Sequence, residues 1–196
     1  MPPRRPERRN EESAAAIIRA AWELCREVGY SKLSIEGIAA RAGVGKNTIY
    51  RWWSSKAAVL LDGFVASIAD VSFPDTGDFA TDIKTEMVSV SGILGSPGVG
   101  PLYGALIGAA QDDPELAAAL RIRLIEPLTA GAVARIERAQ QQGQLRSDLD
   151  PILIVELLYG PTYYRWLLLR HLPDTERLHA IVDAALSGLA PSRQSV

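Results

Sequence analysis

Five side chains able to bind nucleic acid crowd into one and a half helical turns: Lys46, Asn47, Thr48, Tyr50 and Arg51. Arginine and lysine donate hydrogen bonds to guanine or phosphate, asparagine pairs with adenine, and hydroxyl groups bind phosphate oxygens. An α-helix fits the major groove of B-form DNA, where the base edges present donors and acceptors. The cluster therefore predicts a helix that binds double-stranded DNA; the alternative is a solvated helix face without a partner.

Two short helices joined by a tight turn are expected to hold this cluster. Ser34 is suited to cap the first helix, and Gly43 readily adopts the positive φ of a sharp turn. The second helix is predicted from about Gly45 to Trp52, which gives a helix-turn-helix pattern. The inward side chains of the first of these helices are predicted to be Ile35, Ile38, Ala39 and Ala42.

Two further residues suit the phosphates that would flank a contacted base. Ser34 stands at a helix start, where main-chain N–H groups attract anions, and Lys56 adds a cation near the next helix start. Ile49 and Trp53 fall on the inward side of the second helix and are expected to complete the core. Trp52 suits either the core or a contact with sugar and phosphate.

An amphipathic helix is expected before this pair. Asn10 is a candidate cap for a helix that begins at Glu11, and Gly29 is expected to end it. Residues 1–10, which are rich in proline and arginine, are predicted to form a disordered basic arm. The apolar face of this helix recurs at steps of three and four residues, at Ala16, Ile17, Ala20, Ala21, Leu24 and Val28.

Charge divides the chain into a basic head and an acidic body. Residues 1–56 hold 11 Lys/Arg and 6 Asp/Glu, a net charge of +5, whereas residues 57–196 hold 10 and 17, a net charge of −7. This division indicates that only the head meets a polyanion. The alternative is a chance distribution of solvated charges.

The composition indicates an all-α protein. Of its 196 residues, 47% are hydrophobic and 22% charged, and Cys25 is the single cysteine, which excludes a disulfide framework and a cysteine-based zinc site. The apolar stretch 151–172 is interrupted by Glu156 and Arg165, which favours a buried helix over a membrane span. The N-terminal cations precede no apolar segment of a secretory signal, so a cytoplasmic location is expected.

About nine helices are predicted in total. Pro127 and Pro161 fall inside two of them and are expected to bend them. A loop is expected over residues 73–77. Beyond the first three helices, the predicted ranges are about 55–71, 78–94, 101–111, 113–142, 150–171 and 174–189.

Four groups of residues share one register with a known signature: Ile38-Ala39, Ala42-Gly43-Val44, Thr48-Ile49-Tyr50 and Ser55-Lys56. Over about residues 11–60 the chain thereby resembles the TetR family of transcriptional repressors. The resemblance implies a recognition helix from Lys46 to Trp52, with Lys46, Asn47 and Thr48 nearest the bases. It also implies phosphate contacts from Tyr50, Arg51 and Lys56.

Two positions depart from the family pattern. Gly45 stands at the helix start where the family usually has serine or threonine, so a side-chain cap is absent. Trp53 replaces the commoner phenylalanine and requires more room in a small core. Both departures limit what the resemblance implies about the DNA sequence that is bound.

The resemblance further implies an all-helical body that forms a homodimer through its last two long helices. The residues independently permit this, because one helix offers large apolar side chains and the other a face of small residues. The alternative is that both helices are internal core of a monomer. The candidate interface residues are Leu153, Leu157, Pro161, Leu168, Ile181, Ala184, Ala185 and Gly188.

A small-molecule pocket in the body is likewise implied by the resemblance. Apolar and aromatic lining with a few hydroxyl groups suits a small hydrophobic ligand, and the alternative for each residue is an ordinary core position. The candidate lining residues are Phe79, Ile83, Met87, Tyr103, Ile107, Leu124, Tyr163 and Trp166.

The expected function is that of a repressor with a DNA-binding domain over residues 11–56 and a ligand-binding and dimerisation domain over residues 57–196. A dimer would bind a palindromic operator and leave it when the ligand binds, without a cofactor. One alternative is a DNA-binding regulator that needs no ligand or answers to a protein. A remote alternative is a helical metal-dependent enzyme, because Glu176 and His179 have Glu-x-x-His spacing, although the second such motif of a di-iron site is missing.

Overall fold

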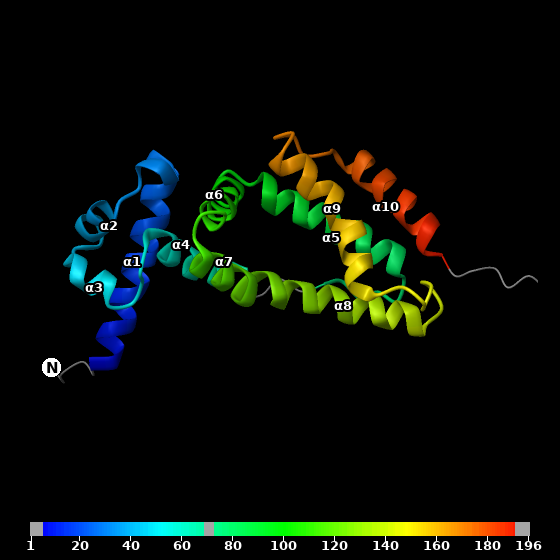
Figure 1. Ribbon diagram of the computed structural model, residues 1–196, viewed down its shortest axis with the longest axis horizontal. Coiled ribbons are helices and arrows are strands. Elements are labelled where there is room, and N and C mark those ends of the chain that lie inside the picture. The colour runs from blue at the N-terminus through cyan, green and yellow to red at the C-terminus, as the bar shows by residue number, and fades with distance from the viewer. Residues whose placement is uncertain (1–5, 69–72, 191–196) are drawn as a thin grey trace, which may run out of the picture. The chain divides into compact units, whose positions relative to one another are not determined.

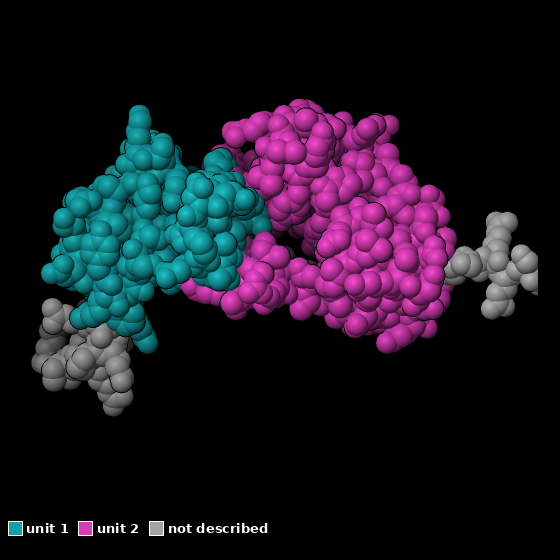
Figure 2. Space-filling model, in the orientation of Figure 1, with its two compact units in different colours: residues 1–70, 101–120 teal, residues 71–100, 121–196 magenta. Residues whose placement is uncertain are grey.

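The computed structural model describes residues 6–68 and 73–190, with side chains from residue 11 onward, and every regular element in these ranges is helical. The predicted all-α class is confirmed. The chain forms two compact units (Figure 2), whose helices are labelled in Figure 1. Unit 1 comprises residues 1–70 and 101–120, and unit 2 comprises residues 71–100 and 121–196.

Unit 1 contains the N-terminal helices and two later ones. Its elements are α1 (Pro6–Val28), the 3₁₀ turn η1 (Tyr30–Lys32), α2 (Ile35–Ala42), α3 (Lys46–Tyr50), α4 (Lys56–Ser67), α6 (Gly100–Ala110) and α7 (Pro114–Leu120). The contacts thus group α6 and α7 with the N-terminal helices, and Tyr103 of α6 stacks on Phe64 of α4 with ring centroids 4.9 Å apart.

The start of α1 corrects one prediction. The helix begins at Pro6 and not at Glu11, so residues 6–10 are helical and Asn10 is not its cap. Proline suits the first helical position, because its φ is already helical and its missing N–H would have no partner there. Residues 1–5 of the predicted arm lie outside the described residues. Val28, predicted to face inward, is exposed.

The core of unit 1 comes from three helices. Ile17 of α1, Ile38 of α2 and Leu60 of α4 are completely buried, and α1 packs against both α2 and α4. Ile49 and Trp53 are also buried, as the sequence predicts. The short helices that carry the polar cluster therefore rest on an apolar base that α1 and α4 complete.

Unit 2 contains α5 (Phe79–Gly95), a π-helical turn η2 (Arg121–Ile125), α8 (Glu126–Gln141), α9 (Pro151–Leu167) and α10 (Thr175–Leu189). The carboxylates of Asp78, Asp150 and Asp174 cap α5, α9 and α10 by accepting main-chain N–H bonds. The sequence predicted helix 113–142 as one element. The structure divides this range into α7, the π-helical turn η2 and α8, and Pro127, which has no N–H to donate to the preceding turn, is the second residue of α8.

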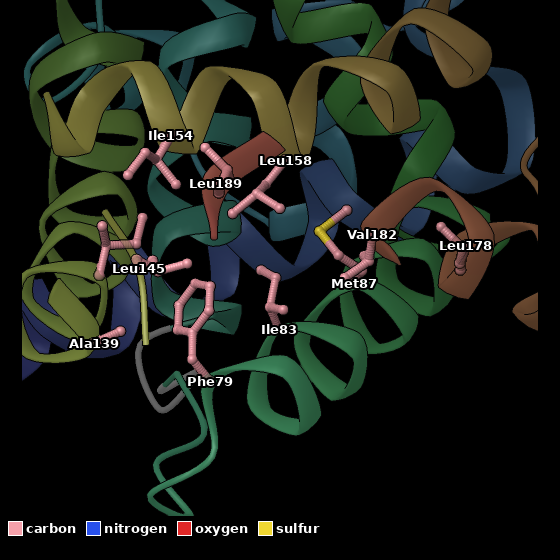
Figure 3. Packing of buried hydrophobic residues seen from close by; sticks show 11 residues of the cluster. Phe79, Ile83, Met87, Ala139, Leu145, Ile154, Leu158, Leu178, Val182 and Leu189 are labelled. Carbon is pink, nitrogen blue, oxygen red and sulfur yellow. The ribbon is translucent and has the colours of Figure 1, made fainter. Parts of the chain in front are cut away.

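All four helices of unit 2 contribute to one apolar core (Figure 3). Phe79, Ile83 and Met87 enter it from α5, and Ile154 and Leu158 enter it from α9. The other members are Ile136, Ala139, Leu145, Leu178, Val182 and Leu189.

Within the described ranges, no helix on its own has both the length and the apolar composition needed to cross a membrane. The consecutive helices α5 and α6 meet that test only as a pair separated by a break.

Candidate nucleic-acid interface

The turn between α2 and α3 is built as the sequence predicts. The Oγ atom of Ser34 accepts a hydrogen bond from the Gly37 N–H at 3.1 Å and caps α2. Gly43 ends α2 with φ 68°, and the N–H of Val44 donates back to the Ala39 carbonyl at 3.0 Å. A residue with a Cβ would be strained at this φ, so glycine fixes the point at which the chain turns.

Helix α3 presents its polar side to solvent. Ile49 faces the core, whereas Tyr50 is 54% exposed and the side chains of Asn47 and Arg51 are also exposed. Thr48 is half-buried. The helix ends at Tyr50, earlier than predicted, and Arg51 and Trp52 continue it as a turn. Gly45 provides no side-chain cap, as its lack of a side chain requires.

Lys46 lies in an exposed ion pair with Glu36. The Nζ atom donates to Glu36 Oε1 at 3.0 Å, and this hydrogen bond raises the pKa of Lys46, which keeps the side chain cationic. An exposed pair of this kind contributes little to stability, so a phosphate oxygen can replace Glu36 at small cost. The ion pair joins α2 to α3. Because its two residues are ten positions apart, the helical spacing of three or four residues does not predict it.

Lys56 has an internal role that sequence reasoning missed. Its Nζ atom donates hydrogen bonds to the carbonyl oxygens of Tyr30 and Leu33, both at 2.8 Å, and lies 4.4 Å from the centre of the Tyr30 ring. Two of its three donors are therefore engaged by the segment that leads into Ser34. Lys56 positions this segment, and its predicted phosphate contact stays a prediction.

The two adjacent tryptophans have different surroundings. Trp53 is buried, and its indole N–H donates to Asp62 Oδ2 at 2.7 Å, so the larger ring that replaces phenylalanine brings a satisfied polar group. Trp52 is half-exposed, and the Arg51 guanidinium lies 5.7 Å from its ring centre. The exposed polar surface of α3 therefore extends to Arg51, whose guanidinium group stacks near the exposed ring of Trp52.

The candidate dimer residues lie on α9, α10 and the turn that follows α9. Leu153 and Leu157 are exposed on α9, and Leu168 is exposed directly after it. Ile152 and Tyr164 of α9, which are not among the predicted interface residues, are exposed as well. Of the other candidates, Ala184 and Gly188 are exposed, and Pro161, Ile181 and Ala185 are half-buried.

The candidate pocket residues do not all lie in one unit. Tyr103 and Ile107 belong to unit 1, whereas the other six belong to unit 2. Within unit 2, Phe79, Ile83, Met87 and Leu124 are fully buried, and the half-buried rings of Tyr163 and Trp166 meet edge to face at 5.9 Å. Sequence reasoning missed Glu86, a buried carboxyl group on α5.

The metal-enzyme alternative finds no support in the described part of the chain. In residues 11–68 and 73–190, no three His, Cys, Asp or Glu side chains come together as ligands of a metal ion. His179 is half-buried and Glu176 exposed at the start of α10.

A helix-turn-helix that rests on an apolar base and exposes a polar recognition face defines a DNA-binding protein. The sequence comparisons identify its family. Residues 17–62 match the family model of bacterial regulatory proteins of the tetR family, and residues 73–185 match the model of the tetracyclin repressor-like C-terminal domain. The chain belongs to the TetR family of DNA-binding transcriptional regulators, whose members are regulators and not enzymes.

Individual relatives match over most of their length. The HTH-type transcriptional regulator YdeS of Bacillus subtilis is 39% identical over 86% of this chain and 85% of its own. The DNA-binding transcriptional repressor TetR of Mycobacteroides abscessus is 33% identical over 93% of this chain and 97% of its own. The crystal structure of the TetR family transcription regulator SCO0332 is 36% identical, with a TM-score of 0.75 over 92% of this chain and all of that one.

Proposed function

We propose that the protein is a repressor that binds a palindromic operator as a homodimer and leaves it when a small hydrophobic ligand binds. The observation that carries this proposal is the exposed polar face of α3, with Asn47, Tyr50 and Arg51 open to solvent over a buried Ile49. In this assignment Lys46, Asn47 and Thr48 lie nearest the bases. Ser34, Tyr50, Arg51 and Lys56 are assigned to phosphates.

Dimerisation follows from the small size of this face. A recognition helix of five residues contacts few base pairs, whereas two copies related by a twofold axis contact two half-sites. The exposed leucines of α9 supply an apolar surface for such a contact: Leu157 is 46% exposed and Leu153 is 41% exposed. The repressor of Mycobacteroides abscessus, 33% identical, supports the assignment of repression.

Ligand release is proposed as a shift between two conformations. A ligand that binds unit 2 more tightly in the conformation that cannot place both recognition helices in successive grooves would lower operator affinity. The apolar and aromatic side chains of α5 and α9 are the candidate contacts for such a ligand.

The DNA assignment can be tested by selecting bound sequences from random duplexes and measuring affinity by fluorescence anisotropy. Asn47→Ala should lose about 1–3 kcal/mol of discrimination at one base pair of each half-site. Arg51→Ala should instead weaken all duplexes and reduce the slope of log K against log salt by about 0.9 for each phosphate contact that is lost. Arg26→Ala, a cation on α1 outside the assigned interface, is the matched control. Failure to bind any duplex at low ionic strength would contradict the proposal.

The dimer assignment has a test of its own in the molar mass of the protein in solution. Leu157→Glu should give a monomer by light scattering, because a charge then lies at the centre of the apolar face. Leu128→Glu on α8, a leucine with 41% exposure outside the assigned face, should leave the dimer intact. A monomeric wild type, or equal effects of the two substitutions, would contradict the proposed interface.

A further inference from the structure

Two acidic residues are buried one helical turn apart on α5, and they have different surroundings. Asp82, which has no exposed surface, accepts two hydrogen bonds from Arg135 at 2.9 and 2.6 Å and two from the N–H and hydroxyl of Thr76 at 2.9 and 2.6 Å. We call Thr76, Asp82 and Arg135 the Asp82 network. The charge of Asp82 is paired and both of its carboxylate oxygen atoms are hydrogen-bonded. The Asp82 network therefore links three parts of unit 2: the loop that precedes α5, α5 itself and α8.

Glu86 is buried without a cation. It is 8% exposed, and the hydroxyl of Tyr159 on α9 donates to its Oε1 atom at a long 3.3 Å. No lysine or arginine in the described part of the chain forms an ion pair with it, and no cation lowers its pKa, which burial raises. An ionised carboxylate in such a place is destabilising until a positive charge or strong donors reach it.

The face of α9 that carries Tyr159 also carries a buried polar group without a hydrogen-bond partner. Thr162 follows Tyr159 by one turn and has no exposed surface, yet its hydroxyl oxygen has no hydrogen-bond partner. Tyr163 and Trp166 continue the same stripe at helical spacing, and their rings meet edge to face. Tyr159, Thr162, Tyr163 and Trp166 thus share one side of α9, and the hydrogen bond from Tyr159 links this side to Glu86 of α5.

We propose that Glu86, Tyr159 and Thr162, here called the Glu86 site, bind the polar end of a small organic cation whose aromatic or apolar part packs on Tyr163 and Trp166. This inference rests on the proposed function, because it names the chemical class of the ligand that unit 2 binds. An ammonium group supplies the positive charge that Glu86 lacks and an N–H donor for the Thr162 oxygen. Aromatic faces add a favourable contact with the same charge.

The contrast with Asp82 explains why the cation is expected from outside the protein. Both acids lie on α5 beside members of the same core, because Ile83 follows Asp82 and Met87 follows Glu86 in sequence (Figure 3). Asp82 has an arginine of the chain itself as its partner, whereas Glu86 has none. A ligand that binds beside Glu86 would therefore have to carry the positive charge that Arg135 provides to Asp82.

Isothermal titration calorimetry with three probes of one carbon skeleton tests the Glu86 site. We expect 4-phenylbutylamine, a cation at pH 7, to bind about tenfold more tightly than neutral 4-phenylbutan-1-ol, and anionic 4-phenylbutyrate to bind most weakly. Glu86→Gln should remove the preference for the amine while the alcohol still binds. Thr162→Val should weaken both the amine and the alcohol. Glu137→Gln, the same substitution at an exposed acid of α8, should leave the preference unchanged.

Three results would overturn the inference: equal binding of amine and alcohol, binding of none of the three probes, or a preference that survives Glu86→Gln. Operator release, measured separately by anisotropy, distinguishes the inference from the proposed function. A probe series that binds in the expected order but leaves DNA affinity unchanged supports the Glu86 site and contradicts ligand release. Release by the alcohol without any preference for the amine supports ligand release and overturns the Glu86 site.

Discussion

The Asp82 network and the Glu86 site differ in what the fold supplies to a buried acid. Both acids lie on α5 and both are at least nine-tenths buried, but Asp82 has Arg135 and Thr76 as partners, whereas Glu86 has one long hydrogen bond from Tyr159. Burial of a charge is therefore not by itself a sign of either stability or binding. The partner decides: a compensated acid holds elements together, and an uncompensated one is available to a ligand.

The two acids also respond to pH with opposite signs. Burial tends to raise the pKa of Asp82, but hydrogen bonds from Thr76 and Arg135 outweigh it and hold this pKa below its ordinary value. For Glu86, burial raises the pKa, and the Tyr159 hydroxyl offsets only part of the increase. Asp82 thus stabilises the fold above its ordinary pKa, and this contribution is lost as pH falls through the lowered value. Glu86 has the opposite dependence. Its contribution to stability is present below its ordinary pKa and is lost as pH rises through the raised value, because the folded chain keeps this proton to a higher pH than the unfolded chain does.

The largest expected effect comes from removing the partner of the compensated acid. Arg135→Met leaves the Asp82 charge buried and unpaired, and we expect a loss of about 3–5 kcal/mol in the free energy of unfolding. Urea unfolding followed by circular dichroism would measure it. Adding Asp82→Asn to the same chain should recover a large part of the loss. A loss below about 1 kcal/mol, as expected for the exposed control Arg138→Met, would show that the Asp82 network is not what stabilises this region.

A smaller loss is expected from the other partner of Asp82. Thr76→Val removes the hydroxyl that donates at 2.6 Å but keeps the main-chain N–H bond, so we expect a loss of about 1–3 kcal/mol. Hydrogen exchange should localise the loss to the start of α5. Thr85→Val on the exposed side of α5 is the matched control, because its hydroxyl bonds only to the Thr81 carbonyl. Equal effects of the two valines would contradict a special role for Asp82.

Glu86→Gln is expected to act in the opposite direction. Because the uncharged amide removes a carboxylate that lacks a cation, the variant should be more stable than the wild type at pH 7, by up to about 1 kcal/mol. The gain should shrink as pH falls towards the ordinary carboxyl pKa of about 4, where the wild-type carboxyl binds a proton in both states. Urea unfolding from pH 4 to pH 8 measures this difference. A variant that is less stable at pH 7 would show that Glu86 is compensated after all.

The smallest effect on stability is expected at an acid that is exposed. Glu36→Gln breaks the ion pair with Lys46 at the surface of unit 1, so the unfolding midpoint should stay unchanged. Operator affinity should increase, since Lys46 no longer has to exchange Glu36 for a phosphate or base. Glu23→Gln, an exposed acid on α1, provides the control in the anisotropy measurement. Unchanged affinity in Glu36→Gln would remove Lys46 from the proposed interface.

Local sequence determined the helix-turn-helix. A cap at Ser34, a turn at Gly43 and the inward positions of Ile49 and Trp53 were all predicted, because each depends on neighbours within about four residues. The register of α3 then followed, and with it the side chains that face solvent. The predicted start of α1 is wrong because both Asn10 and Pro6 suit a helix start, and the local sequence does not choose between them.

Only the tertiary structure decided the partners of the charged groups. Lys56 bonds to carbonyl groups more than twenty residues away, Arg135 reaches Asp82 across 53 residues, and Tyr159 reaches Glu86 across 73. Helical periodicity places each of these residues on a face but does not say which side chain lies opposite. Whether a buried acid has a cation beside it depends on how whole helices pack. For this reason the recognition face could be inferred from sequence, whereas the contrast between Asp82 and Glu86 could not.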